Sequence, residues 1–243
     1  MPTDAFHHLV INLDVQDSGQ RTDPSQLSLR NTVYDIVQSA FAATGIDSQH
    51  QEDRGDGVLL VLPAAVPKKQ MLGRWVNELH EALKERNAPL KEPIKVRVGI
   101  HAGELHHDDH GVAGNDVNIA CRLASCEPAK GTLHAVTRGS MVVAVSDIIY
   151  QSVVRHGGPF IDPDSYRRYP LRTSEFDGFM WLYVPGHSVP PRPTPAPQPP
   201  PTPAQTSLPG AGSVTIGRDG TVVSHSKVRD IVIGGSDHTR RAP

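Results

Sequence analysis

The chain has 243 residues, of which 24 are basic and 26 are acidic, and its formal net charge is −2. This near balance produces no overall field that would favour nucleic acid or an anionic membrane as a partner. No run of about 18 apolar residues is present, so nothing in the sequence predicts a membrane-spanning helix. The first residues lack the basic and apolar regions of a secretion signal. With Cys121 and Cys126 as the only cysteines, we expect a cytoplasmic protein with reduced thiols.

Proline content divides the chain into three predicted parts. Residues 187–211 form a proline-rich linker, because a segment so rich in proline favours a solvated polyproline II spacer over helix or sheet. Residues 1–186 are then one globular domain, and residues 212–243 a short β-rich tail with a hairpin around Asp219-Gly220. A ligand for an SH3-type domain is the second interpretation of the linker. The tail either binds a protein partner by adding strands to its sheet or has no function.

Within residues 1–186, strands and helices alternate. Apolar residues at helical spacing predict helices over residues 25–43, over about 20 residues from Lys68, and over residues 115–125. A short helix is expected at residues 147–155. Apolar runs predict strands at residues 8–13, 49–53, 58–62, 94–103, 141–145, 167–172 and 179–184. This order predicts an α+β domain in which helices cover a mixed sheet.

The candidate functional residues are two carboxylates, an amide and a guanidinium. Asp14 ends the first strand, and Asp56 lies in the turn of the predicted hairpin. Carboxylate oxygens are suitable ligands for Mg²⁺ or Mn²⁺. Asn118 and Arg122 are four residues apart on a predicted helix, so they share a face and suit ribose and phosphate. In the alternative interpretation, Asp14 is a cap, Asp56 forms a turn, and Arg122 is a surface charge.

Four short motifs occur in a characteristic order. They are Leu13-Asp14-Val15, Gly55-Asp56, Val98-Gly99-Ile100-His101-Ala102-Gly103, and the segment from Gly114 to Arg122. On these motifs the chain resembles the class III nucleotidyl cyclase catalytic domain, the adenylate and guanylate cyclase family, over residues 6–185. The resemblance implies a ferredoxin-like class III cyclase fold with a mixed, mostly antiparallel sheet.

The resemblance also implies a chemistry and an assembly. Asp14, Asp56 and the Val15 carbonyl would hold two Mg²⁺ or Mn²⁺ ions, Asn118 would orient the ribose, and Arg122 would stabilise the transition state. In this family the metal ligands and the Asn–Arg pair of one site come from different subunits, which implies a homodimer. The implied reaction converts a nucleoside triphosphate to a 3′,5′-cyclic nucleotide and pyrophosphate in signalling.

The sequence departs from the family pattern in two places. The phosphate-binding segment is replaced by Asp17-Ser18-Gly19-Gln20-Arg21, in which Asp17 adds negative charge and Arg21 offsets it. Glu52 and Gly111 stand where adenylate cyclases usually carry Lys and Asp. A Glu side chain can accept hydrogen bonds from guanine, so Glu52 favours GTP as the substrate. Because Gly111 provides no second polar side chain, a pyrimidine triphosphate is a further possible substrate. In the alternative interpretation, Glu52 is simply an exposed strand residue. The altered phosphate segment favours the main alternative, a catalytically degenerate homologue that binds a nucleotide or protein. A third possibility is a scaffold whose tail is the working part.

Overall fold

The computed structural model describes residues 4–18, 23–46, 50–55, 57–108, 111–173 and 176–194, and four residues further on, Thr215–Ile216 and Val222–Val223. Arg21 and Asp56, two of the predicted site residues, lie outside the described residues. The chain divides into two compact units, Met1–Pro197 and Gln198–Pro243. None of the described helices is long and apolar enough to cross a bilayer.

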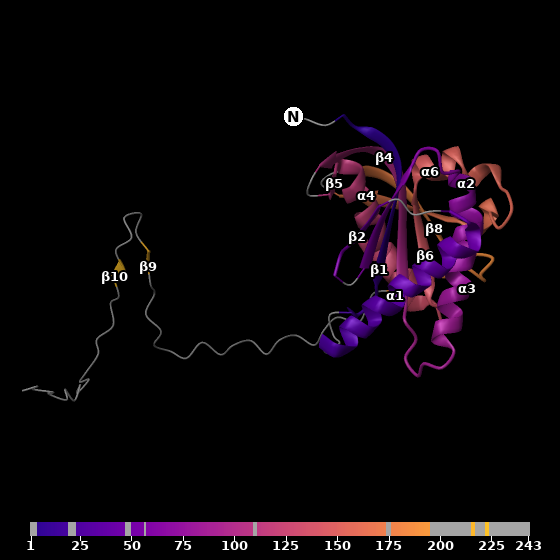
Figure 1. The fold of residues 1–243 in the computed structure, drawn as a ribbon, viewed down its shortest axis with the longest axis horizontal. Helices are drawn as coiled ribbons and strands as arrows, with labels where there is room; N and C mark the ends of the chain where they lie inside the picture. The colour runs from indigo at the N-terminus through magenta and orange to yellow at the C-terminus, as the bar shows by residue number, and fades with distance from the viewer. Residues whose placement is uncertain are drawn as a thin grey trace, which may run out of the picture. The chain divides into compact units, whose positions relative to one another are not determined.

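The first unit is an α+β fold (Figure 1). Its strands are β1 (Phe6–Val15), β2 (His50–Asp53), β3 (Gly57–Pro63), β4 (Val96–Asp108), β5 (Gly111–Ala113), β6 (Met141–Ser146), β7 (Arg167–Arg172) and β8 (Asp177–Tyr183). Its helices are α1 (Asp23–Thr44), α2 (Lys68–Gln70), α3 (Val76–Asn87), α4 (Asn115–Ser125), α5 (Glu127–Ala135) and α6 (Asp147–Ser152). Shorter helical turns are η2 (Met71–Trp75), η3 (Val154–His156) and η4 (Pro163–Ser165).

The strands form one sheet in the order β2-β3-β1-β4-β6-β8-β7, and β5 pairs with β4. All pairs are antiparallel except β4 with β6. The order of β1, α1, β2, β3, α3 and β4 is the ferredoxin-like arrangement. The predicted mixed, mostly antiparallel α+β fold is therefore confirmed.

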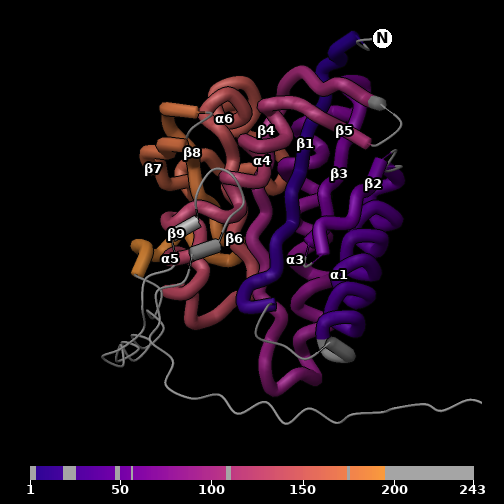
Figure 2. The backbone as a smooth tube through the Cα atoms, turned by 90° about the vertical axis from the view of Figure 1, so that its left-hand side faces the viewer, coloured from indigo at the N-terminus to yellow at the C-terminus, as the bar shows by residue number. Residues whose placement is uncertain are grey.

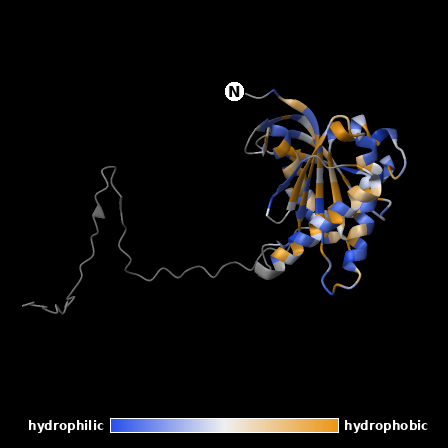
Figure 3. Cartoon of the chain, in the orientation of Figure 1, coloured by the Kyte–Doolittle hydropathy of each residue, from blue (hydrophilic) through white to orange (hydrophobic). Residues whose placement is uncertain are grey.

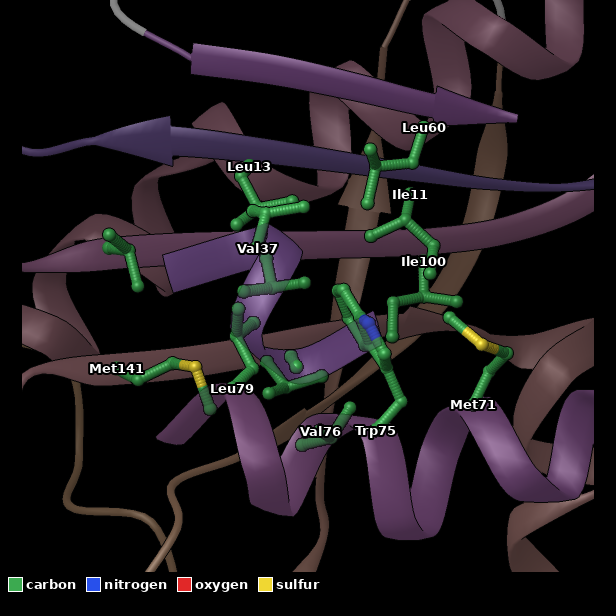
Figure 4. Close-up of a cluster of buried hydrophobic side chains, with 14 of the residues drawn as sticks. Ile11, Leu13, Val37, Leu60, Met71, Trp75, Val76, Leu79, Ile100 and Met141 are labelled. Carbon is green, nitrogen blue, oxygen red and sulfur yellow. The ribbon is translucent and has the colours of Figure 1, made fainter. Parts of the chain in front are cut away.

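One face of the sheet, here called the α1–α3 face, carries the main apolar core. The side chains that alternate inward from β1, among them Leu9, Ile11 and Leu13, meet apolar residues of α1 and α3. Trp75 lies fully buried among them (Figure 4), with its ring centroid 5.4 Å from that of Phe41. Figure 2 shows α1 and α3 running beside β1 and β3, and Figure 3 shows the hydrophobic colouring concentrated on the central strands. The helical apolar spacing seen in the sequence is therefore the core face of these helices.

The opposite face, here called the α4 face, is covered by α4 and α5. Its apolar clusters are smaller, and Val10, Leu59 and Val61 supply the contacts of β1 and β3 to it. Gly99 of β4 lets α4 approach the sheet closely, because a Cβ there would lie 2.2 Å from the Ala120 carbonyl oxygen. Gly103 does the same at the start of the helix, where a Cβ would lie 2.0 Å from the Asp116 carboxyl group. The spacing of these two glycines thus fixes where α4 lies.

Three local features differ from the sequence-based expectations. Strand β4 continues to Asp108 and pairs with β5, whereas the sequence predicted that this strand ends at residue 103. Gly111, with φ of +129°, allows the chain to turn back as β5. The helix predicted from Lys68 contains the π-helical turn η2. Helix α5 was not predicted, because its short segment carries Pro128 and Gly131, which weaken the helical signal.

The chain after β8 stays against the first unit as far as the described residues run. The Thr194 amide donates a hydrogen bond of 3.1 Å to the Gly131 carbonyl of α5, and a Cβ on Gly131 would lie 2.6 Å from the Thr194 oxygen. In the second unit, β9 (Thr215–Ile216) and β10 (Val222–Val223) pair antiparallel where the tail hairpin was expected. The predicted three-part division of the chain, with boundaries at 186 and 211, stays a prediction.

Candidate functional site

Asp14 lies near the end of β1, on the α4 face of the sheet. Its register partners are Gly57 on β3 and Arg97 on β4. Arg97 donates to Asp14 Oδ2 through Nε at 3.1 Å and also through Nη2. The Arg97 side chain is 8% exposed and that of Asp14 18%. A pair so shielded from water is expensive to break by removing one partner, so Arg97 belongs to the candidate site.

The hairpin that carries Asp56 approaches β1 very closely. A Cβ on Gly57 would lie 2.0 Å from the Leu13 carbonyl oxygen, so only glycine fits beside Asp14. The turn is held by the Asp53 side chain, whose Oδ1 accepts from the Gly55 amide at 2.7 Å, and Gly55 has a φ of +79°. The metal-binding role of Asp56 stays a prediction, as does that of the Val15 carbonyl; the Val15 side chain itself is buried in the core of the α1–α3 face.

Glu52 and Gly111 lie in contact, although they are far apart in the sequence. Glu52 Oε1 accepts from His50 Nε2 at 2.9 Å and from the Val112 amide at 2.8 Å, and Oε2 accepts from Arg54 at 2.8 Å. A Cβ on Gly111 would lie 2.4 Å from Glu52 Oε1, so the carboxylate fills the space that a side chain there would need. The pair proposed from the sequence to select the base is therefore one physical unit.

The protonation of Glu52 follows from these contacts. Burial alone would raise the pKa of its carboxyl group, but the hydrogen bonds from His50 and Val112 and the charge of Arg54 together hold the pKa below its usual value. Glu52 is therefore a carboxylate that accepts hydrogen bonds, and not the plain exposed strand residue of the alternative interpretation.

Helix α4 has a buried side that packs on the sheet and an exposed side. Its buried residues are Val117, Ile119, Ala120, Leu123 and Ala124. Asn118 and Arg122 are exposed on the outer side of the helix, one turn apart, as the sequence predicted. Cys121 lies between these two sides of the helix. Burial raises the pKa of its thiol, the charges of Arg54 and Arg122 lower it, and those of Asp14 and Glu52 raise it.

A buried polar chain that the sequence analysis missed anchors the start of α4. His101 Nδ1 lies 2.8 Å from Ser146 Oγ, and His101 Nε2 lies 3.0 Å from Asp116 Oδ1. Asp116 Oδ2 also accepts from the Glu104 amide at 2.7 Å. Burial lowers the pKa of His101, while the hydrogen bond to Asp116 acts in the opposite direction. His101 alternates with Gly99 and Gly103 on β4, and this two-residue period is the signal that places it under α4.

Of the segment from Asp17 to Arg21, in which a phosphate-binding role was considered from the sequence, Asp17 and Ser18 are described. Asp17 has a positive φ of 57°, which is uncommon for a residue with a side chain. Its Oδ2 accepts a hydrogen bond of 3.0 Å from Gln16 Nε2. Arg21, the predicted offsetting charge, lies outside the described residues, so its role stays a prediction.

The donors at this site suit hard cations. Asp14 supplies a carboxylate, and the backbone at Val15 supplies a carbonyl, both of the oxygen type that Mg²⁺ and Mn²⁺ prefer. Among the described residues, no group of three His, Cys, Asp or Glu side chains is arranged to hold a metal ion. By donor chemistry Asp14 and the Val15 carbonyl fit such an ion, with Asp56 as the further predicted carboxylate, but Asp14 Oδ2 is already paired with Arg97.

Comparison with known proteins bears on the fold. No family model and no curated protein sequence matches the chain. The structure of an adenylate/guanylate cyclase/hydrolase from Silicibacter pomeroyi matches with a TM-score of 0.54 and 20% identity, over 75% of this chain and 99% of that chain. The guanylyl cyclase Cya2 matches with a TM-score of 0.53 and 17% identity, over 76% and 93% of the two chains.

The adenylyl cyclase CyaB from P. aeruginosa matches similarly, with a TM-score of 0.52 and 15% identity over 76% of this chain and 95% of that chain. The described domain therefore has the fold of class III adenylyl and guanylyl cyclase catalytic domains. At these identities the likeness concerns the fold alone.

Proposed function

We propose that the protein is a metal-dependent nucleotidyl cyclase that forms a 3′,5′-cyclic nucleotide and pyrophosphate from a nucleoside triphosphate. The observation that carries this proposal is the alignment of Asp14 with Gly57, the residue after Asp56, on neighbouring strands. Gly57 has no room for a side chain, as expected where two metal-binding positions must lie close together. The alignment of Asp14 with Gly57 occurs in a domain that has the cyclase fold, which supports the proposal.

The chain's own residues would act mainly by positioning and by charge. The reaction is an intramolecular attack of the ribose 3′-hydroxyl on the α-phosphorus, and such phosphoryl transfers depend on alignment and on stabilising negative charge. Asn118 would hold the ribose, and the guanidinium of Arg122 would meet the charge that develops on the phosphoryl oxygens. Asp14, Asp56 and the Val15 carbonyl would hold Mg²⁺ or Mn²⁺, which when bound lowers the pKa of a hydroxyl group and neutralises phosphate charge.

The substrate that we propose to try first is GTP. Glu52 is ionised and has about four acceptor positions on its two oxygens, of which His50, Val112 and Arg54 use three. Guanine presents two hydrogens, at N1 and N2. To accept both, Glu52 would use its one remaining acceptor position and the position that Arg54 now occupies. Because the Arg54 side chain is 40% exposed, it can move away at little cost.

We further propose that the working form is a homodimer in the cytoplasm. Asn118 and Arg122 lie exposed on the outer side of α4, where a second copy of the chain could bring its Asp14 and Asp56 to them. Within one chain, the inner side of α4 is fully used in packing against β4 and β1.

Product analysis tests the proposal. The purified full chain is given ATP, GTP, CTP and UTP separately with Mn²⁺, and the products are separated by chromatography. We expect a cyclic product, most from GTP, and its loss in Asp56→Asn with unchanged thermal unfolding. Full activity in Asp56→Asn would refute the two-metal proposal. No product at protein concentrations where the chain dimerises would refute the enzyme.

One observation favours a second function, that of a degenerate homologue that binds a nucleotide or a protein without turnover. Arg97 engages Asp14, and three donors engage Glu52, so both carboxylates are satisfied by the chain itself. In this case a triphosphate would bind without reaction, and calorimetric titration with GTP and Mn²⁺ would show binding with no product.

A further inference from the structure

A cavity away from the candidate cyclase site lies at the C-terminal end of α3. Its volume is about 500 Å³, within the range of small-molecule sites. Three segments form it: the last turns of α3, the loop before β6, and the chain after β8. The lining residues are His80, Leu83, Lys84, Asn87, Ala88, Arg138, Gly139, Ser140, Pro185, Gly186 and His187.

The ionisable residues that line this cavity are all basic. His80 and Lys84 come from α3, Arg138 from the loop before β6, and His187 from the chain after β8. None of the described lining residues is acidic. The nearest carboxylate contacts come from Glu81, whose oxygens lie 3.2 Å from Lys84 Nζ and 3.6 Å from His80 Nδ1. Lys84 is therefore already paired, and its charge also offsets the α3 dipole.

Arg138 has no such structural role. It is exposed, and it makes no hydrogen bond or ion pair with any residue that the structure describes. An arginine has a planar group of donors suited to phosphate and carboxylate. Arg138 is thus the residue of the cavity whose binding capacity the fold leaves unused.

The charges of neighbouring basic groups oppose the protonation of His80. Burial lowers the pKa of His80, Glu81 opposes this, and the charges of Lys84 and His187 lower the pKa further. A bound anion would remove this repulsion and favour the charged imidazoles. The remaining wall is apolar, with Ala88 exposed and with Leu83 and Pro185 buried behind it.

We propose that this cavity binds a small phosphate monoester, with its phosphate at Arg138 and His187 and its organic group against the apolar wall at Ala88. A phosphate monoester carries nearly two negative charges at neutral pH and three strong acceptor oxygens. It therefore suits basic donors that come from three separate segments. The site does not depend on the proposed cyclase activity, because none of its residues belongs to that site.

The test uses the full chain and phenyl phosphate as the probe, with calorimetric titration as the measurement. We expect saturable binding of phenyl phosphate, weaker binding of inorganic phosphate and of benzoate, and none of phenol. Arg138→Ala should weaken phenyl phosphate binding about tenfold or more, because a charge-assisted contact is lost. The matched control is Arg155→Ala, an exposed arginine that bonds to Gln151 at 3.1 Å outside the cavity.

A second readout locates the probe. In NMR spectra of the histidine rings, assigned with His80→Gln and His187→Gln, saturation with phenyl phosphate should shift the ring signals of His80 and His187, while the signals of exposed His156 should not move. Equal binding in wild type and Arg138→Ala, or unchanged ring signals of His80 and His187, would overturn the proposal. Benzoate binding as tight as that of phenyl phosphate would overturn the assignment of a phosphate.

Discussion

The two faces of the sheet carry different kinds of side chains, mainly apolar on the α1–α3 face and partly polar on the α4 face. On the α1–α3 face, inward side chains of the strands meet apolar residues of two long helices and form one continuous core. On the α4 face, the same strands present Asp14, Arg97, His101 and Glu52, and small apolar clusters fill the space between these polar groups. Because strand residues alternate between faces, β1 and β4 serve both faces at once.

This difference indicates that the two faces contribute to different properties, one to stability and the other to the geometry of the candidate site. Apolar burial contributes most of the favourable free energy of folding, so the α1–α3 face should determine stability. Buried polar groups contribute little net stability but fix geometry when every partner is present. Substitutions on the two faces should therefore change different quantities.

The largest effect is expected from Trp75→Ala on the α1–α3 face. Trp75 is fully buried, and removing such a ring leaves a cavity that costs about 3–5 kcal/mol of unfolding free energy. Denaturant titration measures the loss. Leu27→Ala on α1, where the side chain is 61% exposed, is the control and should change stability by less than about 0.5 kcal/mol. Equal losses of stability in the two variants would contradict the assignment of stability to the apolar core of the α1–α3 face.

Arg122→Ala should have the opposite profile on the α4 face. If the cyclase proposal holds, turnover should fall about 10²- to 10³-fold, since a group that stabilises transition-state charge is lost, while KM changes little. Its unfolding free energy should match wild type because Arg122 is exposed. Arg172→Ala, with a side chain 81% exposed, is the control for loss of a surface charge. Wild-type turnover in Arg122→Ala would remove this residue from the proposed mechanism.

Glu52→Gln tests the base-selecting unit. An amide cannot accept from two donors of guanine as a carboxylate does, so kcat/KM for GTP relative to ATP should fall about tenfold. The ratio is measured by assaying both triphosphates in parallel. Glu104→Gln, at an exposed carboxylate on β4, should leave the ratio unchanged. An unchanged ratio in Glu52→Gln would separate Glu52 from base recognition.

The smallest effect is expected in the pH dependence of stability through His101. Burial holds the pKa of His101 below its ordinary value of 6.5, and Asp116 opposes this only in part. Below pH 6.5 the unfolded chain binds a proton that the folded chain does not, so this contribution to stability is complete above pH 6.5 and is lost as pH falls through the native pKa.

Denaturant titrations between pH 7.5 and about pH 5 measure this slope. In His101→Gln the slope should be smaller than in wild type, whereas exposed His156→Gln should keep the wild-type slope. An identical slope in His101→Gln would mean that the buried chain from Ser146 to Asp116 does not control the protonation of His101.

The sequence predicted local elements well and non-local contacts poorly. Helix α1 followed from apolar residues at helical spacing, such as Val33, Val37 and Phe41, and the shared outer face of Asn118 and Arg122 from their four-residue separation. The Arg97–Asp14 pair was missed, because it depends on the register between β1 and β4. The chain of Ser146, His101 and Asp116 was missed for the same reason, since it joins two strands and a helix.

Helix α4 packs on the sheet through its inner side and against glycines on β4, whereas Asn118 and Arg122 lie exposed on its outer side. Substitutions at exposed positions usually change stability by less than about 0.5 kcal/mol, so we expect the fold to tolerate changes at these two residues. Selection for activity alone would maintain them, and a lineage that ceased to need the reaction would lose them while keeping an intact domain. In this architecture the proposed chemistry would depend on a few exposed positions that the fold does not constrain.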